Sequence, residues 1–350
     1  MRARNLIYFT FVATLAFSIA FAGDKRARGD DREKPHVVAP TRARAWKTAE
    51  RGLAFLESDP AKWRKEHVCA TCHHGTMTVW ALSEAKSRGY AVNGESLAEA
   101  VKWTKERLAG IDKPRDTRPG WSMVNTPAIY LAVMARSVPK QEAVTADDLK
   151  RIAGHLLRHQ EVDGSWAWSQ APPQNRPPPV FESDEVATLM GCIALGIPAD
   201  AKENTGARDS REKAAAWLAK TEPGDDTQAA GLRLLVKVWA GTPTKALRTE
   251  MDQFRSRQNR DGGWGQLRGL VSDAYATGQA LYVLNLAGVK NDRPEIQRGV
   301  AFLIANQRED GSWPMSSRAA PGATPYTNPV PITYFGSAWA TLGLMRSAPK

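Results

Sequence analysis

One short motif recurs three times along the chain at a regular spacing. Each copy places a Gln six residues before a Trp, with Asp-Gly between them: HQEVDGSW (159–166), RQNRDGGW (257–264) and NQREDGSW (306–313). Asp-Gly is the chemistry of a tight turn. The second and third Trp residues are 49 residues apart, and the first and second are 98 apart, twice that period. A repeat of this period, with one degenerate copy in the gap, therefore organises the chain.

Each repeat has the same internal plan of two helices. An amphipathic pattern such as 298–307 precedes the turn, and a nearly apolar run such as 272–288 or 334–348 follows it. A helix that is apolar on all faces is buried, whereas an amphipathic helix lies outside it. Weaker copies complete the series: 211–220 with 225–241, 96–110 with 125–137, and 43–58 with 75–89. Because no segment has convincing strand alternation, the pattern predicts an all-α protein of six outer–inner helix pairs, with an irregular helical bundle as the alternative.

These repeats resemble those of the terpenoid cyclase and protein prenyltransferase superfamily, especially squalene–hopene cyclase-like proteins. The resemblance covers residues 43–350 and implies an (α/α)6 toroid, in which six outer helices surround six inner helices and a central cavity. It also implies that the Gln–Trp motifs are structural, with each Trp packed against a neighbouring outer helix and each Gln bonded to backbone groups. The residues concerned are Gln160, Trp166, Gln258, Trp264, Gln307 and Trp313.

The acid motif of that family is not intact here. A squalene–hopene cyclase protonates its substrate with an aspartic acid in a D-x-D-D motif, whereas this chain reads FESDEVAT, with Glu182, Ser183, Asp184 and Glu185. Clustered carboxyl groups raise one another's pKa, which makes Glu182 and Asp184 candidate catalytic acids. The alternative is a helix start, with Ser183 or Asp184 as the cap and Glu185 favoured by the helix dipole. The same two interpretations apply to Asp273.

Two further departures argue against the complete family enzymes. A protein prenyltransferase needs a zinc site of Asp, Cys and His, and no His follows His159. A squalene–hopene cyclase has two helical domains, and this chain supplies one toroid. Whether the protein is an enzyme at all is left open by the sequence.

The N-terminus predicts export. Residues 1–22 combine a positively charged start, an apolar run and an A-x-A cleavage pattern, which are the parts of a signal peptide. An uncleaved membrane anchor is the alternative, since the run is nearly long enough to span a bilayer. Residues 23–42 are rich in charge and predict a flexible linker. We expect a periplasmic or extracellular protein, with no transmembrane segment after cleavage. The basic residues behind the net charge of +11 are scattered, so nucleic acid is not an expected partner.

The stretch VCATCHHG contains Cys69, Cys72 and His73 in the spacing C-x-x-C-H. In an exported protein this spacing predicts covalent haem c, with the two Cys residues as thioether attachments and His73 as the ligand of the haem iron. Three alternatives remain: a Cys69–Cys72 disulfide, a zinc site completed by His74 or His67, or two inert thiols. The third cysteine, Cys192, lies in an apolar run and predicts a small buried side chain.

Three functions are compatible with these observations. The first is an exported, haem-carrying toroid that binds an apolar, isoprenoid-like small molecule or lipid and exchanges electrons with a partner. The second is a haem-free cyclase-like enzyme that uses an acidic residue. The third is a non-catalytic binding or scaffold toroid. Several inner-helix aromatic residues, Trp80, Tyr282 and Trp339 among them, are expected to line an apolar pocket.

Overall fold

The computed structural model describes residues 42–67, 71–106, 108–112, 126–138, 140–167, 183–196, 205–318 and 329–348. All of them belong to one compact unit, Val37–Lys350. The predicted signal peptide and, apart from Arg42, the predicted linker lie outside the described residues.

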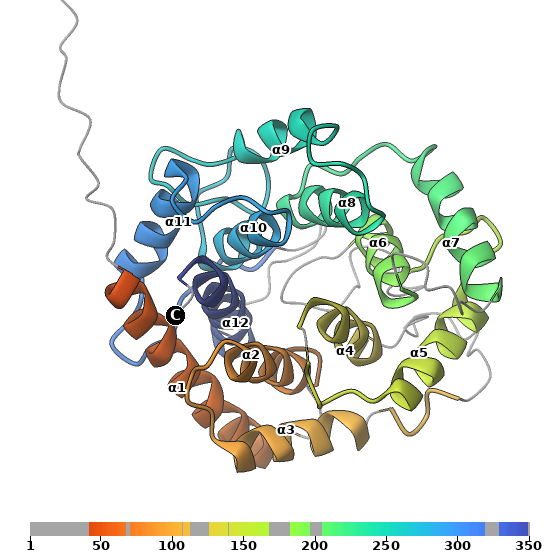
Figure 1. Cartoon of the computed structure of the whole chain (residues 1–350). Coiled ribbons are helices and arrows are strands. Elements are labelled where there is room, and N and C mark those ends of the chain that lie inside the picture. Colours follow the sequence, from red (N-terminus) through yellow and green to blue (C-terminus); the bar gives the residue numbers. More distant parts are fainter. Residues whose placement is uncertain are drawn as a thin grey trace, which may run out of the picture. The chain divides into compact units, whose positions relative to one another are not determined.

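Twelve α-helices of the described residues alternate between an outer and an inner position (Figure 1). The outer helices are α1 (Arg42–Glu66), α3 (Gly94–Glu106), α5 (Ala146–His159), α7 (Thr205–Leu218), α9 (Arg248–Arg255) and α11 (Pro294–Ala305). The inner helices are α2 (Thr76–Ser87), α4 (Thr126–Ser137), α6 (Asp184–Ala194), α8 (Thr227–Trp239), α10 (Ala274–Leu286) and α12 (Pro329–Ser347). A short π-helix, η1 (Thr71–Gly75), leads into α2, and no β-strand occurs among the described residues. The predicted all-α fold of six helical hairpins, an (α/α)6 toroid, is thus confirmed.

The inner helices form a closed ring. Each contacts the next, and α12 contacts α2, so that the last hairpin packs against the first (Figure 1). Their side chains are buried on nearly every face, in agreement with sequences that are apolar all round. The closest approach joins α10 to α12, where a Cβ atom on Gly278 would overlap the backbone carbonyl of Trp339. Glycine is required there because the two backbones touch.

Each of the three Gln–Trp turns links its own hairpin to the outer helix of the next hairpin. Each glutamine amide donates to one carbonyl oxygen in its own turn and to one in the following outer helix, at 2.7–3.0 Å. The pairs of acceptors are Gly164 and Ser210 for Gln160, Gly262 and Glu295 for Gln258, and Gly311 and Thr48 for Gln307. The last of these bonds joins the sixth hairpin to α1 and so closes the outer layer.

The three tryptophans of these turns are completely buried. The Trp264 ring packs on Gly299 of α11, and the Trp313 ring packs on Gly52 of α1, as expected for contact with a neighbouring outer helix. Trp166 instead packs on Gly191 of the inner helix α6. The backbone N–H groups of the three tryptophans donate to hydroxyl groups of the inner helices, on Thr188 of α6, Thr277 of α10 and Ser337 of α12.

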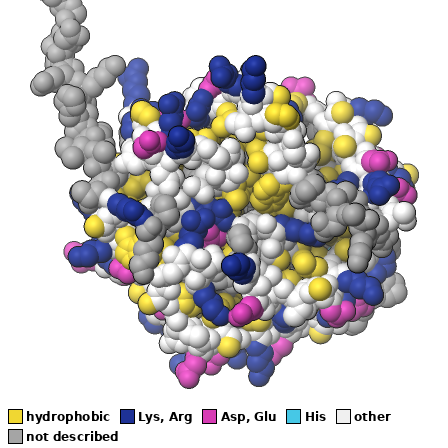
Figure 2. All heavy atoms as spheres, viewed as in Figure 1, with side chains coloured by type: hydrophobic (Ala, Val, Ile, Leu, Met, Phe, Trp, Pro, Cys, Tyr) yellow, Lys and Arg dark blue, Asp and Glu magenta, His cyan; other side chains and the backbone are white. Residues whose placement is uncertain are grey.

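None of the helices in the described part of the chain is both long enough and apolar enough to cross a bilayer. On the face seen in Figure 2, Lys and Arg side chains are scattered over the surface, with hydrophobic side chains visible towards the middle. The scattered distribution agrees with the absence of a basic cluster in the sequence.

Candidate functional site

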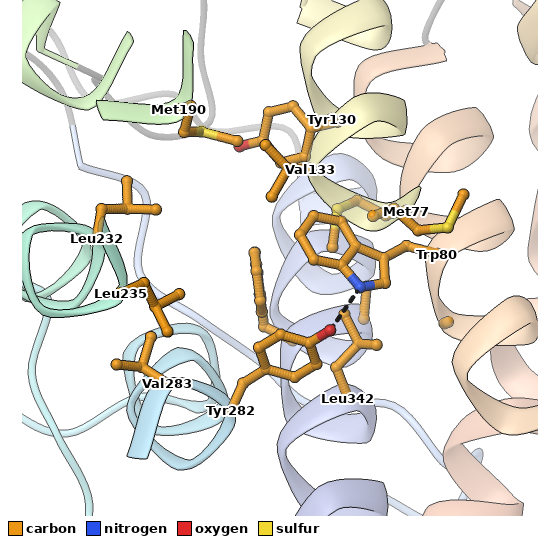
Figure 3. Close-up of a cluster of buried hydrophobic side chains, with 14 of the residues drawn as sticks. Met77, Trp80, Tyr130, Val133, Met190, Leu232, Leu235, Tyr282, Val283 and Leu342 are labelled. Atoms are coloured by element: carbon orange, nitrogen blue, oxygen red, sulfur yellow. Dashed lines mark hydrogen bonds between the residues drawn. The ribbon is translucent and has the colours of Figure 1, made fainter. Parts of the chain in front are cut away.

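A cavity lies at the centre of the inner ring, and all six inner helices contribute to its wall. The lining is mostly apolar, with polar groups at a few positions: Trp80, Val133, Ser137, Met190, Thr227, Gln228, Leu232, Leu235, Gln279, Tyr282, Val283 and Trp339. Figure 3 shows Leu232, Leu235 and Val283 on one side, facing Trp80 and Val133 on the other. These residues include three of the aromatic side chains that the sequence predicted for an apolar pocket.

The cavity is narrow. The open space between its side chains totals about 440 Å³, including space continuous with solvent. About 30 Å³ of this is wide enough for the centres of water-sized molecules, which is room for roughly two waters. A larger occupant must therefore displace side chains from the wall. Met190 is suited to this because an unbranched thioether side chain adapts easily to a new shape.

A buried ion pair lies beside the cavity, near the C-terminal ends of α2 and α12. Arg346 Nη2 donates to Glu84 Oε2 at 2.9 Å and to the Ser137 carbonyl oxygen at 2.6 Å. The Tyr282 hydroxyl donates to Glu84 Oε2 at 3.2 Å, and Arg88 Nε donates to Glu84 Oε1. Burial raises the pKa of Tyr282, and the charge of Glu84 raises it further. The tyrosine is therefore a neutral hydrogen-bonding group at physiological pH.

Most polar groups of the cavity wall have protein partners. The Trp80 indole donates to the Tyr282 hydroxyl at 3.0 Å (Figure 3). The Thr227 hydroxyl donates to the Gly265 carbonyl oxygen at 2.7 Å, and Gln228 Oε1 accepts from the Tyr275 hydroxyl at 3.0 Å. Because these groups already form hydrogen bonds within the protein, they have fewer free donors and acceptors for a ligand.

Two side chains of the wall are exceptions. Gln279, in the middle of α10, is 4% exposed, and neither its amide nitrogen nor its amide oxygen has a hydrogen-bond partner among the described residues. The indole nitrogen of Trp339, in α12, is likewise without a partner in the described part of the chain. Gly278 touches the Trp339 backbone, so the two side chains start from neighbouring points of the cavity wall.

The π-helix η1, which includes Cys72 and His73, packs against α1, α2, α3, α4 and α12, and none of its described side chains lines the cavity. His74 is completely buried and stacks on Trp63 of α1 and Tyr334 of α12, with ring centroids 4.5 and 3.9 Å away. The His73 ring meets Trp63 edge-on at 5.3 Å. Burial, followed by the neighbouring His74, lowers the pKa of His73 to about 3. Both imidazoles are therefore held by aromatic neighbours, and His73 is neutral at physiological pH.

Hydrogen bonds link the two histidines to a carboxylate. His74 Nε2 lies 3.0 Å from Asp59 Oδ2, and His74 Nδ1 contacts His73 Nδ1. If His74 donates from Nε2 to the carboxylate, its Nδ1 accepts from His73 Nδ1–H. That assignment leaves the lone pair of His73 on Nε2, which is the state of an imidazole that binds a metal.

The remaining predicted residues of the motif cannot be placed in the same detail. Cys69 lies outside the described residues, and Cys72 belongs to η1 but its side chain is not among those described. Cys192 is a free, buried thiol, as its apolar context predicted. Among the described side chains, no three His, Cys, Asp or Glu residues gather as a metal site.

The acidic stretch before α6 forms a helix start. Glu182 lies outside the described residues, and Ser183 is the N-cap, with its hydroxyl accepting from the Val186 N–H at 3.3 Å. Asp184 is the first residue of α6. Glu185 accepts from the Gly224 N–H at 2.8 Å and pairs with Arg233. The catalytic role of Glu182 and Asp184 stays a prediction.

Asp273 occupies the same position before α10 and also caps its helix. Its Oδ1 accepts from the Ala276 N–H at 2.8 Å, and its Oδ2 accepts from the Gln266 amide at 2.6 Å. Burial raises the pKa of Asp273 despite these bonds. The residue is absent from the lining of the central cavity.

Sequence reasoning missed Gln279, Glu84, Arg346 and the pairing of His74 with Asp59. Gln279, Glu84 and Arg346 could have been noticed in the sequence, because each is an amide or a charge inside an almost apolar inner helix. Burying such a group without a hydrogen-bond partner costs free energy. Which partner each would find depends on the closed ring, which places α2 beside α12.

Comparisons with known proteins agree with this architecture. The squalene-hopene cyclase C-terminal domain family matches residues 220–349. A squalene–hopene cyclase from Zymomonas mobilis subsp. mobilis is 31% identical over 125 residues, which are 35% of this chain and 18% of that enzyme. The chain therefore matches less than a fifth of the length of this relative.

Solved structures share the whole toroid. The type II terpene cyclase MstE from Scytonema, in complex with merosterolic acid A, superposes with a TM-score of 0.56 at 15% identity, covering 89% of this chain and 99% of that one. The unsaturated glucuronyl hydrolase from Bacillus sp. GL1 gives a TM-score of 0.50 at 15% identity, covering 87% and 96%. The names of the two neighbours describe different chemistries, so this likeness establishes the (α/α)6 toroid fold alone.

Proposed function

We propose that this chain is an exported, terpenoid cyclase-like toroid that binds an apolar, isoprenoid-like molecule in its central cavity and carries c-type haem for a redox role. The observation that carries the binding function is the cavity itself. It is enclosed by apolar side chains from all six inner helices and still retains unpartnered polar atoms on Gln279 and Trp339. Ligand pockets typically combine an apolar wall with a few polar groups of this kind.

Similarity supports the class of ligand. The C-terminal repeats are similar to the squalene–hopene cyclases, and MstE holds a terpenoid product in the same fold. Because the cavity is narrow, binding requires adaptable side chains such as Met190 to move. We expect a ligand smaller than the thirty-carbon substrate of a squalene cyclase.

The haem proposal is supported by the state of His73. Burial lowers the pKa of its imidazole to about 3, and a hydrogen bond from its Nδ1–H to His74 Nδ1 would leave its lone pair on Nε2. Asp59 and His74 would hold the ring in that tautomer, as the outer partners of metal-binding histidines do. Cys69 and Cys72 would bind the haem covalently through thioethers, and the bound haem would supply one-electron transfer to a partner.

The haem proposal is tested with the full chain exported through a haem-attachment system. A reduced alkaline-pyridine spectrum of c-type haem is expected for the native chain and is expected to be lost in Cys72→Ala. Cys192→Ala is the matched control, because that thiol is buried and unrelated to the motif. Colourless native protein, or colour that survives Cys72→Ala, would contradict covalent attachment.

The binding function is tested by filling the cavity. Leu235→Trp places a large ring in the wall, whereas Leu270→Trp makes the same change at an exposed position. Titration with farnesol, followed by native mass spectrometry, is expected to show binding to the native chain and the Leu270 variant but not to a folded Leu235 variant. Equal binding by all three chains would place the ligand elsewhere.

A haem-free cyclase-like enzyme is the second candidate. The observation that favours it is a buried carboxyl group at the start of an inner helix, Asp273, whose pKa is raised by burial in the direction that a general acid requires. Incubation of the haem-free chain with isoprenoid substrates, with Asp184→Asn and Asp273→Asn as variants, tests it. Cyclised product that disappears in either variant would support this candidate, and no product would reject it.

A further inference from the structure

The polar atoms that lack partners in the cavity are concentrated at one place. Trp80, Thr227, Gln228 and Tyr282 line the same wall and all have hydrogen-bond partners. Among the described lining residues, the unpartnered buried polar atoms are both amide atoms of Gln279 and the indole nitrogen of Trp339. An unpaired buried polar group is unfavourable, and native proteins leave few of them. The concentration therefore indicates a missing partner.

The position of the two side chains allows a single group to serve both. They project from neighbouring helices, α10 and α12, which approach so closely that Gly278 touches the Trp339 backbone. Gln279 offers both a donor and an acceptor, and Trp339 offers a donor. A hydroxyl group has one donor hydrogen and two acceptor lone pairs. One hydroxyl therefore has the donor and the acceptors that all three atoms require, whereas a carbonyl oxygen leaves the amide oxygen unpaired.

We infer that the cavity is specific for an uncharged apolar alcohol, an isoprenoid-like molecule whose single hydroxyl group binds between Gln279 and Trp339. This inference rests on the proposed binding function and names the class of its ligand. A charged head group gains no counter-charge from the ion pair beside the cavity, because Arg346 and Glu84 are already paired with each other. A hydrocarbon leaves the three polar atoms desolvated and unpaired, so it binds more weakly.

The alternative occupant is water, since the cavity has room for roughly two molecules. Waters alone would satisfy Gln279 and Trp339 without giving any preference among ligands. A hydroxyl group of the ligand that takes the place of a water keeps these hydrogen bonds, and an apolar group in the same place loses them. The two cases are therefore separated by comparing an alcohol with its hydrocarbon.

The experiment measures the affinity of the full chain for farnesol and for farnesene, which differ mainly in the hydroxyl group. We expect farnesol to bind about 10- to 100-fold more tightly, the range expected when buried polar groups lose their partners. Gln279→Leu removes two of the three polar atoms, so it is expected to reduce this ratio several-fold, leaving the part that the Trp339 N–H supports, and to bind farnesene at least as well as the native chain. Because that change removes an unpaired polar group, it is expected to leave thermal stability equal or higher.

Gln253→Leu is the matched control. It makes the same change at an exposed position of α9, outside the cavity lining, so the farnesol-to-farnesene ratio is expected to stay as in the native chain. An equal affinity of the native chain for both probes, or a ratio unchanged in Gln279→Leu, would overturn the inference and leave the proposed binding function standing. Binding of neither probe to the native chain would overturn both.

Discussion

The buried pair of Glu84 and Arg346 makes a strong prediction about stability. Glu84 is completely buried and Arg346 is 5% exposed, and they are bonded at 2.9 Å across the junction of α2 and α12. In Glu84→Gln, the Arg346 guanidinium keeps its bond to the Ser137 carbonyl but loses its counter-charge. Removing one partner of a buried pair destabilises a protein by about 3–5 kcal/mol. We expect Glu84→Gln to lower the free energy of unfolding by about 3 kcal/mol, at the lower end of this range, because the oxygen of the new amide still accepts one hydrogen bond.

The assay is denaturant and thermal unfolding of a double-mutant cycle. For a unit that spans Val37–Lys350, at about 2.1 cal/mol/K of unfolding entropy per residue, 3 kcal/mol corresponds to a decrease in Tm of roughly 5 °C. Arg346→Met combined with Glu84→Gln removes both charges and is expected to be less destabilising than the sum of the two single changes, by at least about 1 kcal/mol. Glu142→Gln is the control, because its pair with Lys86 is largely exposed and is worth roughly 0–1 kcal/mol.

Two results would refute this reasoning. A loss below about 1 kcal/mol in Glu84→Gln would mean that Arg346 reaches water or another anion. Strict additivity in the cycle would mean that the two charges do not depend on each other. Either result would mean that the ion pair does not stabilise the junction between the first and last hairpins.

Three further changes test other parts of the ring. Gly278→Ala forces α10 away from the Trp339 backbone and is expected to lower the free energy of unfolding by about 3 kcal/mol. The control is Gly94→Ala, where the added methyl group points into open space, and it should change the free energy of unfolding by less than about 0.5 kcal/mol. Gln307→Leu removes one bond to α1 and one within the last turn, and is expected to lower the free energy of unfolding by about 2 kcal/mol in urea. Because burial raises the pKa of Asp273 above its unfolded value, its contribution to stability is present at low pH and is lost as the pH rises through the folded pKa. Asp273→Asn should therefore remove this loss, so that the Tm of the variant relative to the native chain rises with pH in the acidic range; a difference that stays constant with pH would contradict this role of Asp273.

The repeat made the fold predictable because it reports a local pattern. The Gln-to-Trp spacing and the apolar runs identify hairpins, and hairpins of one period stack on one another. The cap before α6 was also predictable, since Ser183 needs only the N–H group three residues later. These features depend on residues close together in the sequence.

The site was less predictable because its contacts span the chain. Arg346 and Glu84 are 262 residues apart in sequence, and nothing in either local segment identifies the other. The unpartnered amide of Gln279 is visible only when its neighbours across the cavity are known. For His73, the motif predicted a ligand of the haem iron. The hydrogen bonds that connect His73 through His74 to Asp59 could not be predicted, because they depend on how α1 packs against η1.

The bond from Gln307 to Thr48 has a consequence for how the molecule comes apart. An open array of repeats has two ends, where units detach one at a time and where special capping units are needed. A circle of hairpins has no such end. Any one hairpin must break its contacts with two neighbours before it can leave, so fraying from a terminus is suppressed and we expect the whole circle to unfold in one cooperative step.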